Sequence, residues 1–440
     1  MKFFIYRLGC PKNEVDADYI AACLLNAGHT QVLTPDEAQA IIINTCGFIL
    51  PAKEESIDAI LQMAQLKTEG SAQKLFATGC LSQRYSQSLM ADIPELDGAF
   101  GLGELDELVR VMSEKTTGRY YTSINPYQLR YLDWKQRFIS DDYPYAYLKI
   151  ADGCNRHCSF CAIPSIRGQY RSRTIDSIIK EARFLVENGK NELILVSQEA
   201  TYWGKDINTR PRLIDLLQEL NDIDGLDWIR VMYMHPSGMD RELIEYMVAD
   251  NKTLAYFDLP LQHICPDILS AMGRPSDCSA IEELIRQIRH SGVDTALRTT
   301  FIVGFPGETD EHFEELYKFV EEIEFERLGA FVFSSEEGTP AATLPNQVQD
   351  DIKAERLDRL MMLQQEIAFA RNNSLIGSQR EVIIDSVNND GTATGRTRWD
   401  CPEIDQEVVV SGRGLRSGLI CQVQIINSEG YDLRGIKCEE

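Results

Sequence analysis

One stretch, Cys154-Asn155-Arg156-His157-Cys158-Ser159-Phe160-Cys161, spaces three cysteines as Cys-x3-Cys-x2-Cys just after a predicted strand, 145–150. Three thiolates can hold three irons of a four-iron cluster, which leaves the fourth iron open to a small molecule. The alternative is a zinc site with His157 or a distant residue as the fourth ligand. The spacing, the position at a strand end and the β/α surroundings favour the cluster.

The motif opens a long alternation of predicted strands and helices that continues to about residue 373. The candidate strands are 145–150, 192–197, 228–233, 256–259, 298–303 and 327–333. A helix is expected at 309–323, where Thr309-Asp310-Glu311 places acidic residues in the first turn. This alternation predicts a parallel β/α (TIM-like) barrel, complete or incomplete, with catalytic loops after the carboxyl ends of its strands.

The first 115 residues repeat a strand–cysteine–helix unit around Cys10, Cys46 and Cys80, which are 36 and 34 residues apart. The predicted strands are 3–8, 40–44 and 75–78, and the predicted helices are 14–27, 52–67 and 82–90. Continuous apolar strands with right-handed crossovers place the three cysteines at the carboxyl edge of one parallel sheet, where ligands bind. A single cysteine at a strand end is often an ordinary buried core residue. Three cysteines at equivalent strand ends indicate instead a second cluster with an open iron.

The pattern changes to short strands of period 2 from about residue 374. Expected strands are 381–385, 407–411 and 420–426, with turn signals at 388–391 and 428–430. These features predict a small antiparallel β-barrel of OB-like size. The predicted domains are therefore 1–116, a connector at 117–139, a core at 140–373 and a terminal barrel at 374–440.

Composition narrows the class of protein and its partners. The 440 residues have a hydrophobic fraction of 44%, enough for several cores, and contain no run of about 18 apolar residues. We expect a cytoplasmic chain without a signal peptide or membrane span. Its 12 cysteines in a reducing compartment indicate metal or redox chemistry. The net charge of −24 disfavours stable binding to nucleic acid and favours a basic partner.

The central motif resembles the radical-SAM signature, and the order of the three domains is similar to the methylthiotransferase family across essentially the whole chain. The terminal barrel resembles a TRAM domain. Matching stretches are Gly153-Cys154-Asn155, Ile163-Pro-Ser-Ile-Arg-Gly168, Ser172-Arg173 and Phe301-Ile-Val-Gly-Phe-Pro-Gly-Glu-Thr309.

The resemblance implies two [4Fe-4S] clusters and S-adenosylmethionine (SAM). Cys154, Cys158 and Cys161 would hold the cluster that cleaves SAM, and Cys10, Cys46 and Cys80 an auxiliary cluster that carries the methylthio group. A second SAM would supply the methyl, and a flavodoxin-type reductant the electron. Both iron sites are expected to face one cavity.

Several stretches resemble the RimO subgroup, which methylthiolates an aspartate β-carbon in the basic small-subunit ribosomal protein S-twelve. They are Ala162-Ile-Pro-Ser-Ile-Arg-Gly168, Asp258-Leu-Pro-Leu-Gln-His263 and Cys401-Pro-Glu-Ile-Asp405. Residues 376–440 hold 7 Lys/Arg and 11 Asp/Glu, a net charge of −4, whereas an RNA-binding barrel would be basic. One departure is Glu199, where the subgroup has aspartate.

Two other functions remain open at this level. A tRNA (adenosine-derivative) methylthiotransferase uses the same chemistry but needs a basic groove near the terminal barrel. A non-catalytic iron–sulfur scaffold or electron-transfer protein has no need of an open iron in each cluster.

Weaker candidates for a cofactor or substrate pocket lie near predicted strand ends or in the loop after the motif. They are Gln198, Glu199, His235, Gln262, Thr300, Gly304, Arg167, Arg171 and Arg173. The arginines suit a carboxylate of SAM or of the substrate, or form a basic loop surface. Gly304 begins a turn that approaches SAM or is a plain βα turn. His157 is expected to be a spacer, and cysteines 23, 265, 278, 401, 421 and 438 lack cluster spacing.

Overall fold

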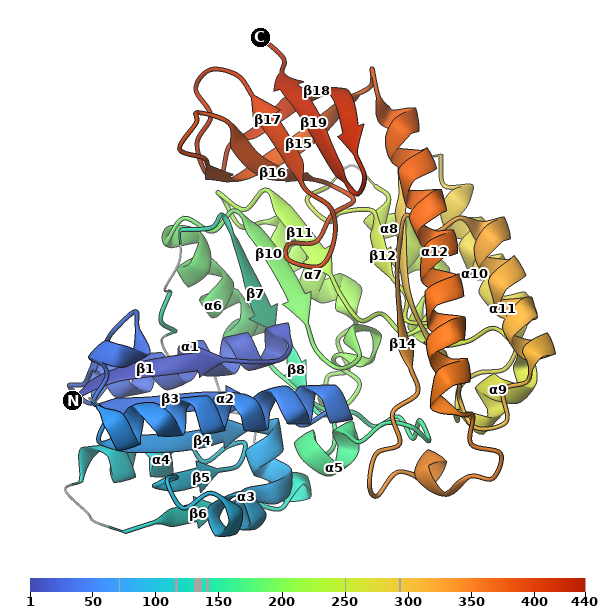
Figure 1. Cartoon of the computed structure of the whole chain (residues 1–440). Helices are drawn as coiled ribbons and strands as arrows, with labels where there is room; N and C mark the ends of the chain where they lie inside the picture. Colours follow the sequence, from blue (N-terminus) through green and yellow to red (C-terminus); the bar gives the residue numbers. More distant parts are fainter. Residues whose placement is uncertain are drawn as a thin grey trace. The chain divides into compact units, whose positions relative to one another are not determined.

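The computed structural model describes residues 1–70, 72–114, 118–129, 137–139, 142–249, 251–292 and 294–439 (Figure 1). The chain forms two compact units. The first comprises Met1–Ser140, Lys149–Glu181 and Ser334–Ala342, and the second comprises Asp141–Leu148, Ala182–Phe333 and Thr343–Glu440. Over the described ranges, no helix is both long enough and apolar enough to cross a membrane.

The first unit contains a six-stranded parallel sheet with the order β2-β1-β3-β4-β5-β6. Its strands are β1 (Lys2–Arg7), β2 (Thr30–Gln31), β3 (Ala40–Thr45), β4 (Lys74–Gly79), β5 (Gly98–Phe100) and β6 (Tyr120–Thr122). The strand β3 is buried along its whole length because both faces of the sheet are covered, which is why it reads as a continuous apolar run.

Helices cover both faces of this sheet. They are α1 (Pro11–Asn26), α2 (Leu50–Glu69), α3 (Cys80–Asp92) and α4 (Leu105–Ser113), with short 3-10 turns η1 (Pro35–Glu37) and η2 (Pro126–Gln128). On one face Ile41 packs with Ile60 of α2, and on the other Ile42 packs with Ile20 of α1. The predicted parallel α/β domain is confirmed. Residues 117 and 130–136 of the predicted connector lie outside the described residues, and its described part includes β6 and η2.

The remainder of the first unit carries the central cysteine motif. The short strands β8 (Ala151–Asp152) and β9 (Arg171–Ser172) pair antiparallel, and between them lie the cysteine loop and helix α5 (Ile163–Arg167).

The second unit contains six β/α-type strands in two parallel three-stranded sheets, β11-β10-β7 and β12-β13-β14. The strands are β7 (Tyr145–Lys149), β10 (Glu192–Val196), β11 (Trp228–Val231), β12 (Tyr256–Asp258), β13 (Ala296–Val303) and β14 (Arg327–Val332). Beyond the end of β11, the Met234 N–H donates to the carbonyl of Asp258 in β12 at 2.9 Å, so the sheets continue one another. The predicted β/α barrel is therefore confirmed in its incomplete form.

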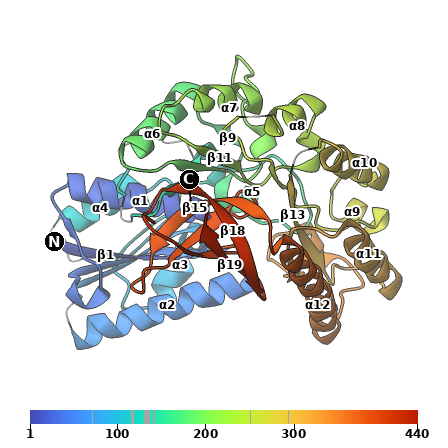
Figure 2. The same ribbon diagram turned by 90° about the horizontal axis from the view of Figure 1, so that it is seen from above.

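Helices of the second unit follow one another along the outer side of these strands (Figure 2). They are α6 (Ile175–Glu187, which begins in the first unit), α7 (Leu213–Asn221), α8 (Arg241–Met247), α9 (Pro266–Ala271), α10 (Cys278–Arg289), α11 (Asp310–Ile323) and α12 (Asp350–Leu375), with 3-10 turns η3 (Ala200–Tyr202) and η4 (Pro236–Gly238). A further 3-10 turn, η5 (Pro340–Thr343), belongs to the first unit up to Ala342.

The C-terminal strands close into a barrel, which confirms the predicted small β-barrel. They are β15 (Gln379–Val387), β16 (Ala393–Thr397), β17 (Val408–Ser411), β18 (Ile420–Glu429) and β19 (Asp432–Lys437). The prediction of wholly antiparallel strands is wrong at one pairing, because β17 and β19 run parallel. A closed ring of five strands cannot alternate direction throughout, so one pairing must be parallel.

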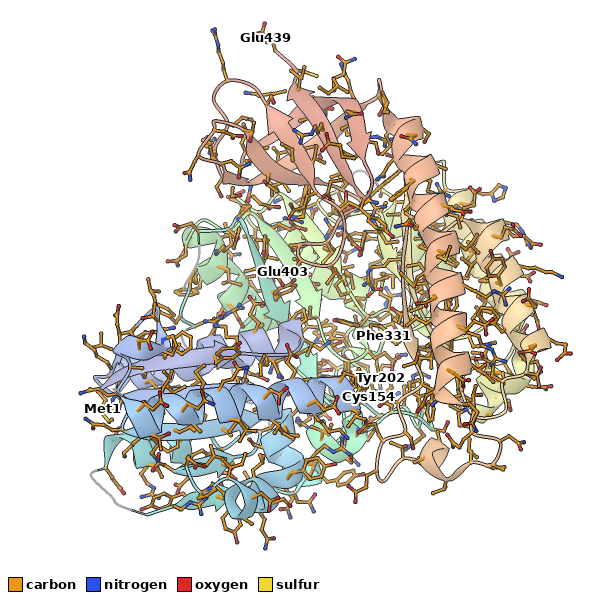
Figure 3. The ribbon with its side chains drawn as sticks, viewed as in Figure 1. Met1, Cys154, Tyr202, Phe331, Glu403 and Glu439 are labelled. Carbon is orange, nitrogen blue, oxygen red and sulfur yellow. The ribbon has the colours of Figure 1, made fainter. Side chains whose placement is uncertain are left out.

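Buried charges connect this barrel to the amino-terminal ends of the core strands within the second unit. Glu192 is fully buried and accepts from Arg230 at 2.9 Å and from Arg396 at 2.7 Å. The loop that carries Glu403 reaches the core strands (Figure 3), where Glu403 accepts from the hydroxyl of Tyr147 at 3.4 Å. The Tyr256 hydroxyl donates to Asp405 at 2.6 Å. The loop containing Cys401-Pro-Glu-Ile-Asp405 is therefore part of the core interface.

Replacing Glu192 with glutamine should destabilise the second unit by about 3–5 kcal/mol, because it leaves two buried arginines without their shared carboxylate. Burial acts to raise the pKa of Glu192, but Arg396 and Arg230 lower it below its ordinary value. The contribution of Glu192 to the free energy of unfolding is thus complete above the unfolded-state pKa of about 4.3 and is lost as the pH falls through the folded-state pKa.

Urea unfolding measures the free energy lost in Glu192→Gln. Glu381→Gln, at a partly exposed pair with Arg398, should cost at most about 1 kcal/mol, and equal losses would contradict the argument.

Candidate functional site

The cysteines at 10, 46 and 80 lie at the carboxyl ends of three adjacent parallel strands, β1, β3 and β4. Cys10 is the residue before α1, Cys46 directly follows β3, and Cys80 is the first residue of α3. Cys46 and Cys80 are buried and Cys10 is half-buried. Three thiols, each just after the carboxyl end of a parallel strand, therefore meet at the ligand-binding edge of the sheet.

Glycines let the three cysteine turns approach one another closely. Gly9 has φ +92°, and a Cβ placed on it would lie 2.9 Å from the Cβ of Cys46 and 3.3 Å from its Sγ. A Cβ on Gly47 would lie 2.7 Å from the backbone of Leu81, next to Cys80. Any larger residue at either position would displace a cysteine turn, so the backbone is shaped around the thiols, as a shared cluster requires.

Asn13 connects the ends of the same strands, although the sequence analysis did not single it out. Its Nδ2 donates to the carbonyls of Leu8 at 3.1 Å and Thr45 at 3.0 Å. Its Oδ1 lies 3.6 Å from the Sγ of Cys80. Asn13 is 1% exposed. A polar residue two positions after the Cys10-Pro pair, in the first turn of a helix whose start is buried, was the available signal.

The guanidinium of Arg167 lies at this cluster of thiols, where the buried Lys12 is a second cation that acts on Cys10. The Nη2 of Arg167 lies 3.5 Å from the Sγ of Cys80 and donates to Asn13 Oδ1 at 2.6 Å. Burial raises the pKa of the Cys80 thiol to about 12, against the opposing charge of Arg167. Burial also acts to raise the pKa of Cys10, but Lys12 and Arg167 lower it below its ordinary value. Iron binding would remove the thiol protons, since the thiolate is the ligand.

The cysteines at 154, 158 and 161 lie in the loop between β8 and α5, and all three are half-buried. Figure 3 labels Cys154. The N–H of Cys154 donates to the carbonyl of Gly168 at 3.1 Å, and the N–H of Cys161 donates to that of Cys158 at 3.1 Å. Gly153 has φ +79°, and a Cβ there would lie 2.1 Å from the Gln169 carbonyl oxygen. His157 in this loop is exposed. The compact turn fits a ligand set for three irons.

Both cysteine trios belong to the first unit and lie near each other there. Cys80 packs against Ala162, the residue after Cys161, and against Ile166 of α5. A cavity at the same sheet edge is lined by Gly79, next to Cys80, and by Asp152, two residues before Cys154, together with Asp16, Asn44, Lys149 and Arg171. Residues close to each trio in the sequence therefore line one cavity, but the six cysteines are not among its lining residues, so that both iron sites face one cavity stays a prediction.

No three described His, Cys, Asp or Glu side chains are close enough to hold a single metal ion. A four-iron cluster needs a wider arrangement than a single ion, because each thiolate binds a different iron.

The three arginine candidates have different surroundings. Arg167 faces Cys80, as described. Arg171 donates to the carbonyls of Arg167 at 2.9 Å and Gln169 at 2.7 Å, and it lines the cavity. Arg173 is fully buried, where it pairs with Glu181 and donates to the carbonyl of Lys149 at 2.9 Å.

Two of the strand-end candidates meet in the second unit. Thr201 accepts from the His235 N–H at 3.3 Å and donates to Glu199 at 3.5 Å. Glu199 and His235 are 3% and 5% exposed, and Gln198 beside them is half-buried. These side chains follow β10 and β11, on the edge where a β/α barrel carries its catalytic loops.

The remaining candidates lie around β13. Gln262, with φ +73°, donates its N–H to the carbonyl of Thr300 at 2.8 Å. Gly304 has φ +72°, and its N–H donates to Glu308 at 2.9 Å. A Cβ on Gly304 would lie 2.2 Å from the Lys353 side chain, so close packing against α12 already requires glycine there.

Comparison with known proteins agrees with this architecture. Residues 2–101 match the Uncharacterized protein family UPF0004, residues 148–320 the Radical SAM superfamily and residues 376–436 the TRAM domain. Proteins named ribosomal protein uS12 methylthiotransferase RimO are similar over nearly the whole chain. The protein of Clostridioides difficile is 43% identical, with coverage of 99% of this chain and 98% of its own. That of Desulforamulus reducens is 44% identical, with coverage of 97% of both.

The chain belongs to the RimO family of ribosomal protein uS12 methylthiotransferases.

Family membership confirms three predictions: the RimO subgroup, the enzyme class of a radical SAM transferase, and the cofactors SAM and [4Fe-4S] clusters. The alternative of a non-catalytic iron–sulfur protein is therefore wrong. Among solved structures, the radical SAM methyltransferase TsrM of Kitasatospora setae has a TM-score of 0.55 at 14% identity, covering 86% of this chain and 80% of its own. That similarity concerns the fold alone.

Proposed function

We propose that the chain replaces a hydrogen on the β-carbon of an aspartate in ribosomal protein uS12 with a methylthio group. The observation that carries the proposal is the packing of Cys80, from one cysteine trio, against Ala162, the residue after Cys161 of the other trio, in a chain similar along its full length to RimO proteins. We assign the SAM-binding cluster to Cys154, Cys158 and Cys161 and the auxiliary cluster to Cys10, Cys46 and Cys80. We also propose the domain boundaries predicted from the sequence, which are 1–116, 117–139, 140–373 and 374–440.

When bound, the clusters supply the electron that splits SAM into methionine and a deoxyadenosyl radical and hold the methylthio group for transfer. The chain's residues hold and shield these groups. The closed turn between Cys154 and Gly168 fixes the first trio, and Asn13 fixes the strand ends that carry the second. Burial of Cys46 and Cys80 excludes water from the side of the auxiliary site that the sheet covers.

The partners follow from charge and chemistry. The acidic terminal barrel, with a net charge of −4 over residues 376–440, suits a basic ribosomal protein by electrostatic complementarity. We propose a flavodoxin-type protein as the electron donor and the cytoplasm as the location, since uS12 is made and assembled there. The pocket residues for SAM and substrate are proposed to include Gln198, Glu199, His235, Gln262, Thr300, Gly304 and Arg171.

A competition experiment tests the substrate. The full-length protein is reconstituted without oxygen with iron and sulfide, then given SAM, a methylthio source and dithionite. Purified uS12 and an anticodon stem-loop RNA are present at equal concentration, and mass spectrometry follows both. We expect the mass of one methylthio group in place of hydrogen on a uS12 aspartate and none on the RNA. Modification of the RNA alone would overturn the proposed substrate and leave the chemistry intact.

A further inference from the structure

Arg167 occupies a position from which it contacts groups of both cysteine segments. It is the last residue of α5, the helix that follows Cys161, and its side chain is 1% exposed. Its Nη1 donates to Asp152 at 3.0 Å, two residues before Cys154. Its Nη2 reaches the Sγ of Cys80 at 3.5 Å, 87 residues away in the sequence. One planar guanidinium thus joins the loop of one trio to a thiol of the other.

The partners of Arg167 define how its charge is distributed. Nη2 also donates to Asn13 at 2.6 Å and to Asp16 at 3.1 Å, so the two carboxylates Asp16 and Asp152 share its charge on the side of the cavity. Lys149 pairs with the same two carboxylates and partly offsets them. The face of the guanidinium toward Cys80 therefore keeps positive character. Only a fork of several N–H donors can satisfy these partners together, which explains arginine here and not lysine.

We propose that Arg167 is a positioning residue whose contact with the sulfur of Cys80 raises the reduction potential of the auxiliary cluster. The inference rests on the proposed assignment of that cluster to Cys10, Cys46 and Cys80. Reduction adds one negative charge to a cluster already surrounded by thiolates. A buried cation in contact with a ligand sulfur stabilises the reduced state, because net charge and hydrogen bonds to sulfur set cluster potentials.

A redox titration tests the proposal without reference to turnover. The parent protein for this test is the full-length chain with Cys154→Ala, Cys158→Ala and Cys161→Ala, so that only the auxiliary cluster assembles. Dithionite reduces the auxiliary cluster by one electron, and electron paramagnetic resonance measures the reduced fraction at each of a series of fixed potentials. Arg167→Gln in this background should lower the midpoint potential by at least about 59 mV, a tenfold change in the one-electron equilibrium constant. Arg167→Lys, which keeps the charge, should have a midpoint potential between that of the unaltered background and that of Arg167→Gln.

Two further variants separate charge from structural damage. Asp16→Asn removes a carboxylate from the same group and should shift the potential upward, opposite to Arg167→Gln. Arg137→Gln removes another buried arginine of the first unit, one that pairs with Asp18 and Glu181, and should leave the potential unchanged. Equal potentials for Arg167→Gln and its parent, or a downward shift in Asp16→Asn, would overturn the proposal.

The assignment on which the inference rests has its own readout. The parent should bind about four irons per chain and lose them when Cys10, Cys46 and Cys80 are also replaced. If the parent binds no cluster, or keeps it without those three cysteines, the proposed cluster assignment fails and the inference with it.

Discussion

Replacing Cys154, Cys158 and Cys161 with alanine should abolish both SAM cleavage and methylthio transfer to uS12. Without three thiolates, no cluster forms at this loop, and neither the electron nor the open iron is available to SAM. Iron should fall from about eight to about four per chain, since the auxiliary cluster remains. The measurements are deoxyadenosine formation by chromatography, iron content, and the mass of uS12.

The matched control removes the same number of half-buried thiols elsewhere. Cys23, Cys278 and Cys438 lie outside both trios, and their replacement by alanine should keep about eight irons and full SAM cleavage. Deoxyadenosine formation at the rate of the unaltered protein, after loss of the 154/158/161 trio, would contradict the assignment of the SAM-cleaving cluster.

Replacing Cys10, Cys46 and Cys80 should separate the two halves of the reaction. SAM cleavage should continue, because the loop of the other trio has its own backbone bonds, such as Cys154 to Gly168. Transfer of the methylthio group should be lost, since no auxiliary iron remains to carry it. Iron should again fall to about four per chain. Deoxyadenosine would then form without any gain of mass on uS12.

Serine at the same positions gives a control close in size for the second trio. Cys46 and Cys80 are 9% and 5% exposed, so a serine hydroxyl keeps the packing while it removes the thiolate. Thermal unfolding of the apo protein should then change little while transfer is lost. Continued methylthiolation of uS12 by either variant would show that the auxiliary site lies elsewhere.

Much of the fold could be predicted because the signals are local. The apolar runs 3–8, 40–44 and 75–78 correspond to β1, β3 and β4, and each cysteine follows its strand as predicted. The six core strands were located for the same reason. The sequence patterns missed the short strands β2, β5, β6, β8 and β9 and the barrel strands β16 and β19. These strands are only two to six residues long and hold polar residues or glycine, so their pairing depends on neighbours distant in sequence.

The order of residues is enough to show which thiols can act as two sets, since cysteine spacing and strand ends can be read from it. The tertiary structure alone decided what surrounds them. Asn13 meets Leu8 and Thr45 because α1 starts beneath two adjacent strand ends, and Arg167 meets Cys80 because α5 packs on α3. Likewise, Arg173 turned out to pair with Glu181 inside the unit. Contacts between residues far apart in sequence depend on packing, and no local pattern encodes that packing.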